Sequence, residues 1–209
     1  LPKSNENSCQ VFFLFSDRKL KGGVRKVDAE SNNAIKSVIK NQDFSGACGQ
    51  AIVLRGVTGS ASDRILLVGL GERGTTKREQ WLEACAAAAE SLCATPSVIG
   101  FSDCLVSCPL DSMSVAEQAG LFASEIVKAT YVFNLHGGKN TPQSKKLSQF
   151  VLSAGKASIA SATDGVIQGV AVGHGVEVAK NLGNLAPNIC TPEYLANLAK
   201  DMAMQSENI

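Results

Sequence analysis

Residues 50–92, QAIVLRGVTGSASDRILLVGLGERGTTKREQWLEACAAAAESL, place two strand signals, a turn, a glycine-rich loop and a helix signal in close succession. Apolar and β-branched residues predict strands over residues 50–57 and 64–68, and the turn formers at residues 58–63 are few enough for an antiparallel hairpin. A helix is predicted over residues 76–92 because its apolar side chains recur at helical spacing. This apolar stripe consists of Trp81, Cys85, Ala88 and Leu92.

Strand and helix signals alternate along the rest of the chain. Helical crossovers favour parallel neighbours whereas a hairpin is antiparallel, so the sequence predicts an α/β fold with a mixed sheet. Ser114 and Glu117 have the spacing of a capping box. The basic residues 18–26 are interpreted as a solvated loop, and residues 137–144 as a second loop. Further strands are predicted over residues 9–15, 97–101, 131–135 and 147–153, and helices over residues 29–40 and 114–130.

Glycines recur every fourth residue in residues 164–182, at Gly165, Gly169 and Gly173. Gly175, Ala179 and Gly183 repeat the same spacing. Each glycine inside a helix costs about 1 kcal/mol relative to alanine, and this cost is offset when the glycine lets another backbone come close. Polar residues interrupt the segment, which favours a soluble connecting helix over a helix dimer in lipid. We expect a connecting helix that packs tightly on a neighbour.

The composition excludes several classes of function. The net charge is +1, with 20 basic and 19 acidic residues, so the chain lacks the basic footprint of a nucleic-acid-binding protein. Its seven cysteines are irregularly spaced and only two histidines are present, which predicts free buried thiols rather than a zinc site or disulfides. The first residues are polar and no apolar run is long enough to span a bilayer, so neither a signal peptide nor a membrane anchor is expected.

Residues 69–74, GLGERG, match the Gly-x-Gly-x-x-Gly pattern of dinucleotide-binding proteins, with Asp103 after the next predicted strand. The rival hypothesis is therefore a nucleotide-binding module that uses the Gly69–Gly74 loop. Three features oppose it: the loop follows a hairpin strand, Glu72 puts a carboxylate where phosphate would bind, and the third glycine precedes the helix. The alternative interpretation is that Gly69 and Gly71 permit a tight turn between strand and helix.

No catalytic group is predicted from the residue pattern. His136 precedes two glycines in a loop, and His174 lies in the glycine-rich helix, but neither has an evident catalytic partner in the sequence. A Gly-x-Ser-x-Gly elbow and a His-Glu-x-x-His pair are both absent. Two-metal hydrolysis requires bridging carboxylates, and we find no such cluster. We therefore assign no catalytic, metal or cofactor-binding residue to this chain.

Residues 181–196, NLGNLAPNICTPEYLA, indicate a helix end, a rigid turn and the start of a new helix. Thr191 can cap that helix, and Pro192 suits its first position. The segment resembles the leucyl aminopeptidase family, in which an Asn-x-Pro-x-Asn-x-x-Thr-Pro-x-x-Leu-Ala pattern joins a linker helix to the catalytic domain. Ala186 departs from that pattern because proline is usual there. The matching residues are Asn184, Asn188, Thr191, Pro192, Leu195 and Ala196.

This resemblance implies an N-terminal α/β domain over residues 1–157, similar in fold to macro domains, with helices on both faces of the sheet. It further implies a linker helix over residues 158–186 and the start of a truncated catalytic domain over residues 187–209. The full enzyme would be a cytoplasmic hexamer that removes N-terminal amino acids from peptides with two divalent metal ions, zinc or manganese. The family's metal signature, Asn-Thr-Asp-Ala-Glu-Gly-Arg-Leu, is absent and would lie beyond Ile209. The chain alone is expected to be inactive and to serve regulation or assembly. The macro-like fold adds ADP-ribose to NAD as a ligand for the rival hypothesis.

Overall fold

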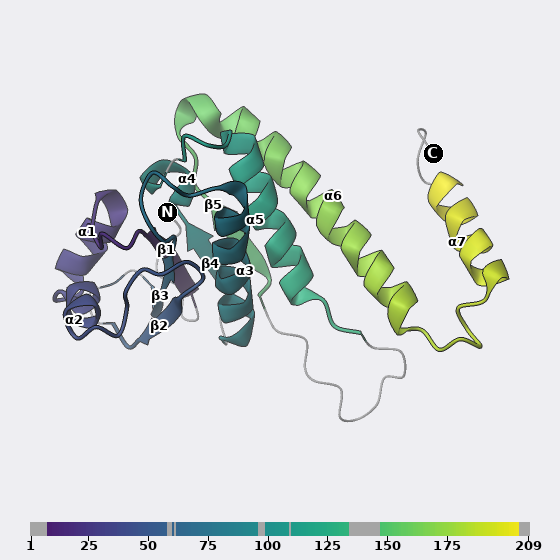
Figure 1. The fold of residues 1–209 in the computed structure, drawn as a ribbon, viewed down its shortest axis with the longest axis horizontal. Helices are drawn as coiled ribbons and strands as arrows, with labels where there is room; N and C mark the ends of the chain where they lie inside the picture. Colours follow the sequence, from purple (N-terminus) through teal and green to yellow (C-terminus); the bar gives the residue numbers. More distant parts are fainter. Residues whose placement is uncertain are drawn as a thin grey trace.

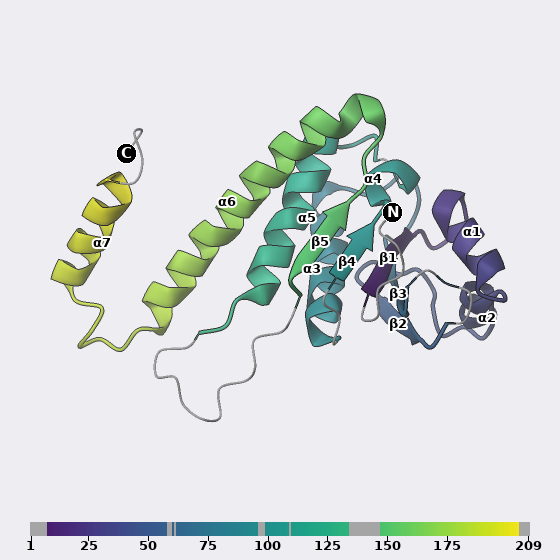
Figure 2. The same ribbon diagram turned by 180° about the vertical axis from the view of Figure 1, so that it is seen from behind.

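The computed structural model describes residues 8–57, 60, 62–95, 99–108, 110–133 and 147–204. Within these ranges the chain forms a mixed five-stranded sheet in the order β2-β3-β1-β4-β5 (Figures 1 and 2). Parallel pairing joins β1 to β3, β1 to β4 and β4 to β5, while β2 and β3 form the predicted antiparallel hairpin. The strands are β1 (Ser8–Leu14), β2 (Ala51–Arg55), β3 (Arg64–Gly69), β4 (Ile99–Ser102) and β5 (Gln149–Leu152).

Helices cover both faces of this sheet, as expected, and β1 shows why. Alternate residues of a strand point to opposite faces, and every residue of β1 is buried. Val11 and Phe13 pack with α3 (Arg78–Ala94) and α5 (Val115–Thr130), whereas Phe12 packs with α1 (Gly22–Glu30) and α2 (Ala34–Lys40). A central strand buried on both sides therefore separates two hydrophobic cores.

The larger core centres on three aromatic rings. Phe13 of β1 lies 5.0 Å from Trp81 of α3 and 5.4 Å from Phe122 of α5, measured between ring centroids. The indole N–H of Trp81 donates a hydrogen bond of 3.1 Å to the carbonyl of Gln118, so its one polar group is satisfied. These contacts fix α3 and α5 on the same face of the sheet.

From residue 156 to residue 204 the chain lies outside the sheet. After a short 3-10 turn (Lys156–Ser158), α6 (Ile159–Asn184) runs beside α5, and α7 (Pro192–Met204) lies apart from the rest of the chain in both views (Figures 1 and 2). A short helix, α4 (Cys104–Ser107), follows β4. Among the helices of the described residues, none has the length and apolar character needed to cross a membrane.

Two predictions near the N-terminus were wrong. The segment predicted as a basic loop contains α1, whose Val24 and Val27 are buried against the sheet. The single helix predicted over residues 29–40 is interrupted, because Asn32 and Asn33 adopt left-handed backbone conformations with φ of 54° and 59°. Asparagine tolerates this conformation better than most residues, so the chain turns there and α2 begins at Ala34.

The strand predicted over residues 131–135 is not formed by residues 131–133, which have no regular structure. The remainder of that prediction, the loop predicted at residues 137–144 and His136 lie outside the described residues. Residues 58, 59 and 61 of the predicted hairpin turn also lie outside them. The other predicted strands and helices are present, with shifts of a few residues at their ends.

Candidate functional site

The described residues contain no group of three or more His, Cys, Asp or Glu side chains that could hold a metal ion. His174 is exposed, and its Nδ1 lies 2.8 Å from Oε2 of Glu177 one turn further along the same helix. That arrangement is a local helical pair, and it supplies no convergent set of ligands. The residues in these ranges do not fit a two-metal centre, so no metal-dependent step is derived from them.

The Gly69–Gly74 loop serves as a tight connection between β3 and α3. Gly71 and Gly74 have φ of +74° and +84°, a left-handed conformation that side chains disfavour. A Cβ on Gly69 would lie 1.9 Å from the carbonyl oxygen of Ala47, so only glycine fits there. The helix begins at Arg78, four residues after the last glycine. The structure therefore agrees with the turn interpretation of this motif.

The crevice beyond the carboxyl end of β1 is where an open α/β sheet would bind a ligand, because the chain crosses to opposite sides of this strand. Arg73 occupies it: its guanidinium lies 4.0 Å from the centroid of the Phe15 ring and its Nε 2.9 Å from Oδ2 of Asp17. The Arg73 guanidinium lowers the pKa of the Asp17 carboxyl. The cavity beside it is about 10 Å³, at most the space of one water molecule.

Asp103, the residue that a dinucleotide site would direct at a ribose, contacts groups of α4 and α1. Its Oδ1 accepts a hydrogen bond of 3.0 Å from the Ser107 hydroxyl, and its Oδ2 lies 2.5 Å from where a Cβ on Gly23 would be. Burial raises the pKa of the Asp103 carboxyl, and the Ser107 hydrogen bond opposes that rise. Asp103 therefore packs against the start of α1.

All seven cysteines lie in the described residues, and each is a thiol rather than half of a disulfide, as predicted. Five are buried: Cys9, Cys85, Cys93, Cys104 and Cys108. Burial raises the pKa of the Cys104 thiol to about 12 and that of the Cys108 thiol to about 11. Since the thiolate is the reactive form, these thiols are unsuited to nucleophilic catalysis at neutral pH.

The glycines of α6 lie in close contact with α5. A Cβ on Gly165 or Gly169 would lie 2.0 Å from the carbonyl oxygen of Ala116 or Gly120 on α5, respectively. A Cβ on Gly173 would lie 2.6 Å from Cβ of Val127. The absence of these atoms lets the two backbones touch, which confirms the tight packing predicted from the spacing. We call this contact the glycine seam.

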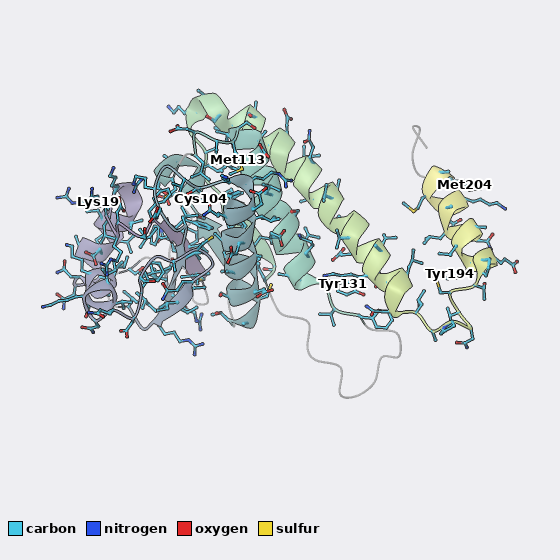
Figure 3. The ribbon with its side chains drawn as sticks, in the orientation of Figure 1. Lys19, Cys104, Met113, Tyr131, Tyr194 and Met204 are labelled. Atoms are coloured by element: carbon cyan, nitrogen blue, oxygen red, sulfur yellow. The ribbon has the colours of Figure 1, made fainter. Side chains whose placement is uncertain are left out.

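Tyr131, directly after α5, holds the far end of α6. Its hydroxyl donates a hydrogen bond of 2.9 Å to Oδ1 of Asn181 and accepts one of 3.2 Å from Nδ2 of Asn184. Lys180 places its Nζ 5.1 Å from the centroid of the tyrosine ring. Figure 3 shows Tyr131 beside the C-terminal end of α6. The residue pattern carries no signal for this contact, because it predicts a strand at Tyr131.

The turn after α6 leads into a helix with no buried residue. The carbonyl of Ala186 accepts hydrogen bonds from the N–H groups of Ile189 and Cys190, and Oγ1 of Thr191 accepts from the N–H of Tyr194, the predicted helix cap. Leu195 and Met202 of α7 are each 44% exposed. Figure 3 shows Tyr194 and Met204 on α7, away from the sheet and its helices. We define the C-terminal arm as α6, the turn at residues 185–191 and α7.

Comparison with known proteins identifies similar sequences and folds. A family model described as "Cytosol aminopeptidase family, N-terminal domain" matches residues 11–136. The probable cytosol aminopeptidase of Dechloromonas aromatica is 31% identical over 203 residues, which are 97% of this chain and 41% of that protein. The one from Burkholderia multivorans is 32% identical over 208 residues, covering 98% of this chain and 41% of that protein. The chain thus spans about two fifths of the length of these relatives.

Two solved structures share the fold. A mutant of tomato leucine aminopeptidase superimposes with a TM-score of 0.76 at 21% identity, covering 96% of this chain and 40% of that one. A bottromycin maturation enzyme, BotP, in complex with Mn gives a TM-score of 0.69 at 17% identity, covering 96% of this chain and 37% of that one. Both matches extend beyond the sheet into the C-terminal arm, since they cover nearly the whole chain.

Proposed function

The chain belongs to the cytosol aminopeptidase family, whose N-terminal domain it carries, and on that premise we propose that it is the assembly and positioning part of a metal-dependent aminopeptidase. The parent enzyme would remove N-terminal amino acids from peptides. The residues described here would hold a catalytic unit in place and take no part in bond cleavage. The chain alone would be inactive.

The observation that carries this proposal is the C-terminal arm. Its first helix is fixed to the sheet domain by the glycine seam and by Tyr131, whereas α7 has no buried residue. Leu195, Leu198 and Met202 recur at helical spacing on α7, which is typical of a helix that packs on a core. In the proposed enzyme, this core belongs to the catalytic unit that α7 begins.

Two divalent metal ions, zinc or manganese, would supply the Lewis acid and the activated water of the parent enzyme. The Mn bound by BotP, together with the aminopeptidase names of the relatives, supports metal dependence. Those ions would bind residues that follow α7 in the relatives, because the described residues offer no suitable group. We propose as well that the parent enzyme is cytosolic and assembles as a hexamer.

The first experiment measures hydrolysis of leucine p-nitroanilide by the purified 209-residue chain with Mn²⁺ or Zn²⁺ added. No turnover is expected, because the described side chains cannot hold two metal ions. A relative's full-length enzyme, purified and assayed in parallel, shows that the assay works. Metal-dependent turnover that follows the chain through purification would refute the proposal.

The second experiment tests positioning through a chimera. The chain replaces the matching N-terminal part of the Burkholderia multivorans relative, and activity and oligomeric state are measured together. Leu198→Lys on the apolar face of α7 is expected to abolish both, because a charge then faces the catalytic unit. The matched control is Glu193→Lys, on a polar position of the same helix, which should leave both unchanged. An active Leu198→Lys chimera would show that α7 does not position the catalytic unit.

A further inference from the structure

A hollow with a basic lining lies between α1, α2 and the loop that follows β1, and we call it the basic hollow. Its volume is about 420 Å³, which is within the range of small-molecule sites in proteins. Both ribbon views place α1 and α2 at the end of the molecule opposite α7, so the basic hollow is remote from the helix that begins the proposed catalytic unit (Figures 1 and 2). Its lining consists of Arg18, Leu20, Arg25, Lys36, Ile39 and Lys40.

Four of the six lining residues are basic and none is acidic. All four basic residues are exposed, so a solute can reach their charged groups. Lys36 has a carboxylate partner, since its Nζ lies 3.1 Å from Oδ2 of the buried Asp28. No carboxylate of the described residues forms an ion pair with Arg18, Arg25 or Lys40. The basic hollow therefore has three uncompensated positive charges.

The acidic residues of the same segment are already paired. Residues 17–40 contain three of them, and each lies within ion-pair distance of a basic side chain. Like charges that line one hollow repel each other, so an anion bound between them would be favourable. The three existing pairs are Asp17–Arg73, Asp28–Lys36 and Glu30–Lys26.

Local hydrogen bonds fix two of the four basic residues. The N–H of Lys36 donates a hydrogen bond of 3.0 Å to Oδ1 of Asp28, and its Nζ donates one of 3.1 Å to Oδ1 of Asn33. Arg18 has a φ of 53°, a left-handed conformation that is uncommon for residues other than glycine. Its N–H donates a hydrogen bond of 2.8 Å to the carbonyl of Phe15, which closes the turn after β1. Groups that are held in place before binding lose less freedom when a ligand binds.

The lining fits an anion that carries two phosphate groups. Guanidinium groups bind phosphate oxygens through pairs of parallel hydrogen bonds, and an ammonium group adds a point charge. One phosphate group carries a charge of about −1.5 to −2 at neutral pH, so two are needed to balance three positive charges. We propose that the basic hollow binds a small ligand with two adjacent phosphate groups, held by Arg18, Arg25 and Lys40. Leu20 and Ile39 would contact any organic part of that ligand.

This site goes beyond the proposed function, which does not require it. A small ligand is favoured over a long polyanion, because the positive charge is confined to one hollow and the net charge of the chain is only +1. Failure of this proposal would leave the role of the C-terminal arm untouched, since α7 lies at the other end of the molecule.

The test follows the melting temperature of the 209-residue chain as inorganic pyrophosphate is added, at constant ionic strength and with EDTA present. A ligand that binds the native state raises the melting temperature saturably. Arg25→Gln is expected to weaken pyrophosphate binding at least about tenfold, because charge-assisted hydrogen bonds are lost. Inorganic phosphate should bind more weakly than pyrophosphate. ADP, titrated in parallel, identifies the source: tighter binding than pyrophosphate indicates an organic diphosphate, and weaker binding indicates the free ion.

The matched control is Lys26→Gln, which removes a positive charge at the next position of α1 from a residue that does not line the basic hollow. It should bind pyrophosphate as the unmodified chain does. Without ligand, Arg25→Gln should melt no lower than the unmodified chain, because Arg25 is exposed and has no ion-pair partner among the described residues.

Three results would overturn the proposal. The first is the absence of a saturable rise with pyrophosphate and with ADP. The second is a loss of binding in Lys26→Gln as large as that in Arg25→Gln. The third is binding of inorganic phosphate as tight as that of pyrophosphate. A short DNA duplex that binds more tightly than pyrophosphate, and is weakened by Arg25→Gln, would assign the basic hollow to nucleic acid and overturn the proposal as well.

Discussion

At the scale of single residues, the glycines of α6 fall into two groups. Gly165, Gly169 and Gly173 are buried and touch α5, whereas a Cβ on Gly175 or Gly183 would have no atom within 4 Å. The first group is required by the close approach of two backbones. The second group gives up helix stability without any contact in this structure to offset it.

Gly169→Ala is expected to lower the free energy of unfolding by about 1–3 kcal/mol, because the new Cβ would overlap a backbone carbonyl that cannot move aside. Gly175→Ala, six residues further along the same helix, should raise it by about 1 kcal/mol, because alanine favours the helix and the space is open. Urea unfolding followed by circular dichroism measures both variants. If the two substitutions have the same sign, the seam does not control the position of α6.

The Asp103 carboxyl makes stability depend on pH. Burial raises its pKa in the folded chain, so the protonated form is favoured there. The contribution of Asp103 to the free energy of unfolding is fully present below the ordinary pKa of an aspartate carboxyl. It is lost as the pH rises through the raised pKa of the folded chain. Asp103→Asn should therefore gain stability relative to the unmodified chain as the pH rises from acidic to neutral.

The free energy of unfolding, measured across that pH range, checks this prediction. Asp111→Asn, at an exposed residue, is the control. A difference between Asp103→Asn and the unmodified chain that stays constant with pH would contradict the prediction.

At the scale of helices and strands, the sequence predicted elements whose signals are local. The α5 helix begins where Ser114 predicts, and the Ser114 hydroxyl accepts a hydrogen bond from the N–H of Glu117. The Glu117 carboxylate, in contrast, lies 3.1 Å from the guanidinium of Arg78 on α3. A cap depends on residues a few positions apart, so spacing alone reveals it, whereas the ion pair joins residues that only the fold brings together.

The α1 helix could not be predicted in this way. It begins with Gly22 and Gly23, which disfavour helix, and its stability comes from Val24 and Val27 against the sheet. The break before α2 also involves a contact between residues eight apart, since the fully buried carboxylate of Asp28 accepts a hydrogen bond from the N–H of Lys36. Tertiary contacts therefore stabilise α1, whereas the break before α2 arises from the local turn at Asn32 and Asn33.

The same distinction applies to the candidate site. The glycine seam was predictable, because a spacing of four along one helix marks one face. Neither Arg73 above Phe15 nor Tyr131 beside Asn181 has such a periodic signal. Each contact joins residues fifty or more positions apart, and it exists only once the fold has placed them side by side.

The hydrogen bonds of Tyr131 are expected to stabilise the C-terminal end of α6. Tyr131→Phe removes both hydrogen bonds of the hydroxyl and should cost about 1 kcal/mol locally. Hydrogen exchange of the amides in the last two turns of α6 should quicken about fivefold, while α3 and the first half of α6 stay unchanged. The control, Tyr194→Phe on α7, should leave exchange in α6 as it is. Unaltered exchange at the end of α6 in Tyr131→Phe would show that the seam alone holds the helix.

At the scale of the whole molecule, α6 behaves as part of the sheet domain. The linker predicted over residues 158–186 stays a prediction as a domain assignment. The contacts of α6 described above are made with α5 and with Tyr131, which belong to the sheet domain. Gly165, Gly169 and Gly173 lie against α5 near its start, middle and end, and Tyr131 adds a contact beyond them. A helix fixed along its length cannot bend freely, so movement between the two parts of the chain must arise after Asn184.

The turn at residues 185–191 is therefore expected to act as the single hinge of the C-terminal arm. Isolated helices shorter than about 12–15 residues are marginal in water, and α7 has 13 residues with none buried. Hydrogen exchange of the 209-residue chain should show protected amides through α6 and little protection in α7. Limited proteolysis should cut first within residues 185–204 and leave the sheet domain with α6 intact. In the active chimera, where α7 has a partner, protection of α7 should rise toward that of α6. If α7 were already as protected as α6 in the chain alone, the arm would be one rigid piece and its apolar face would need another explanation.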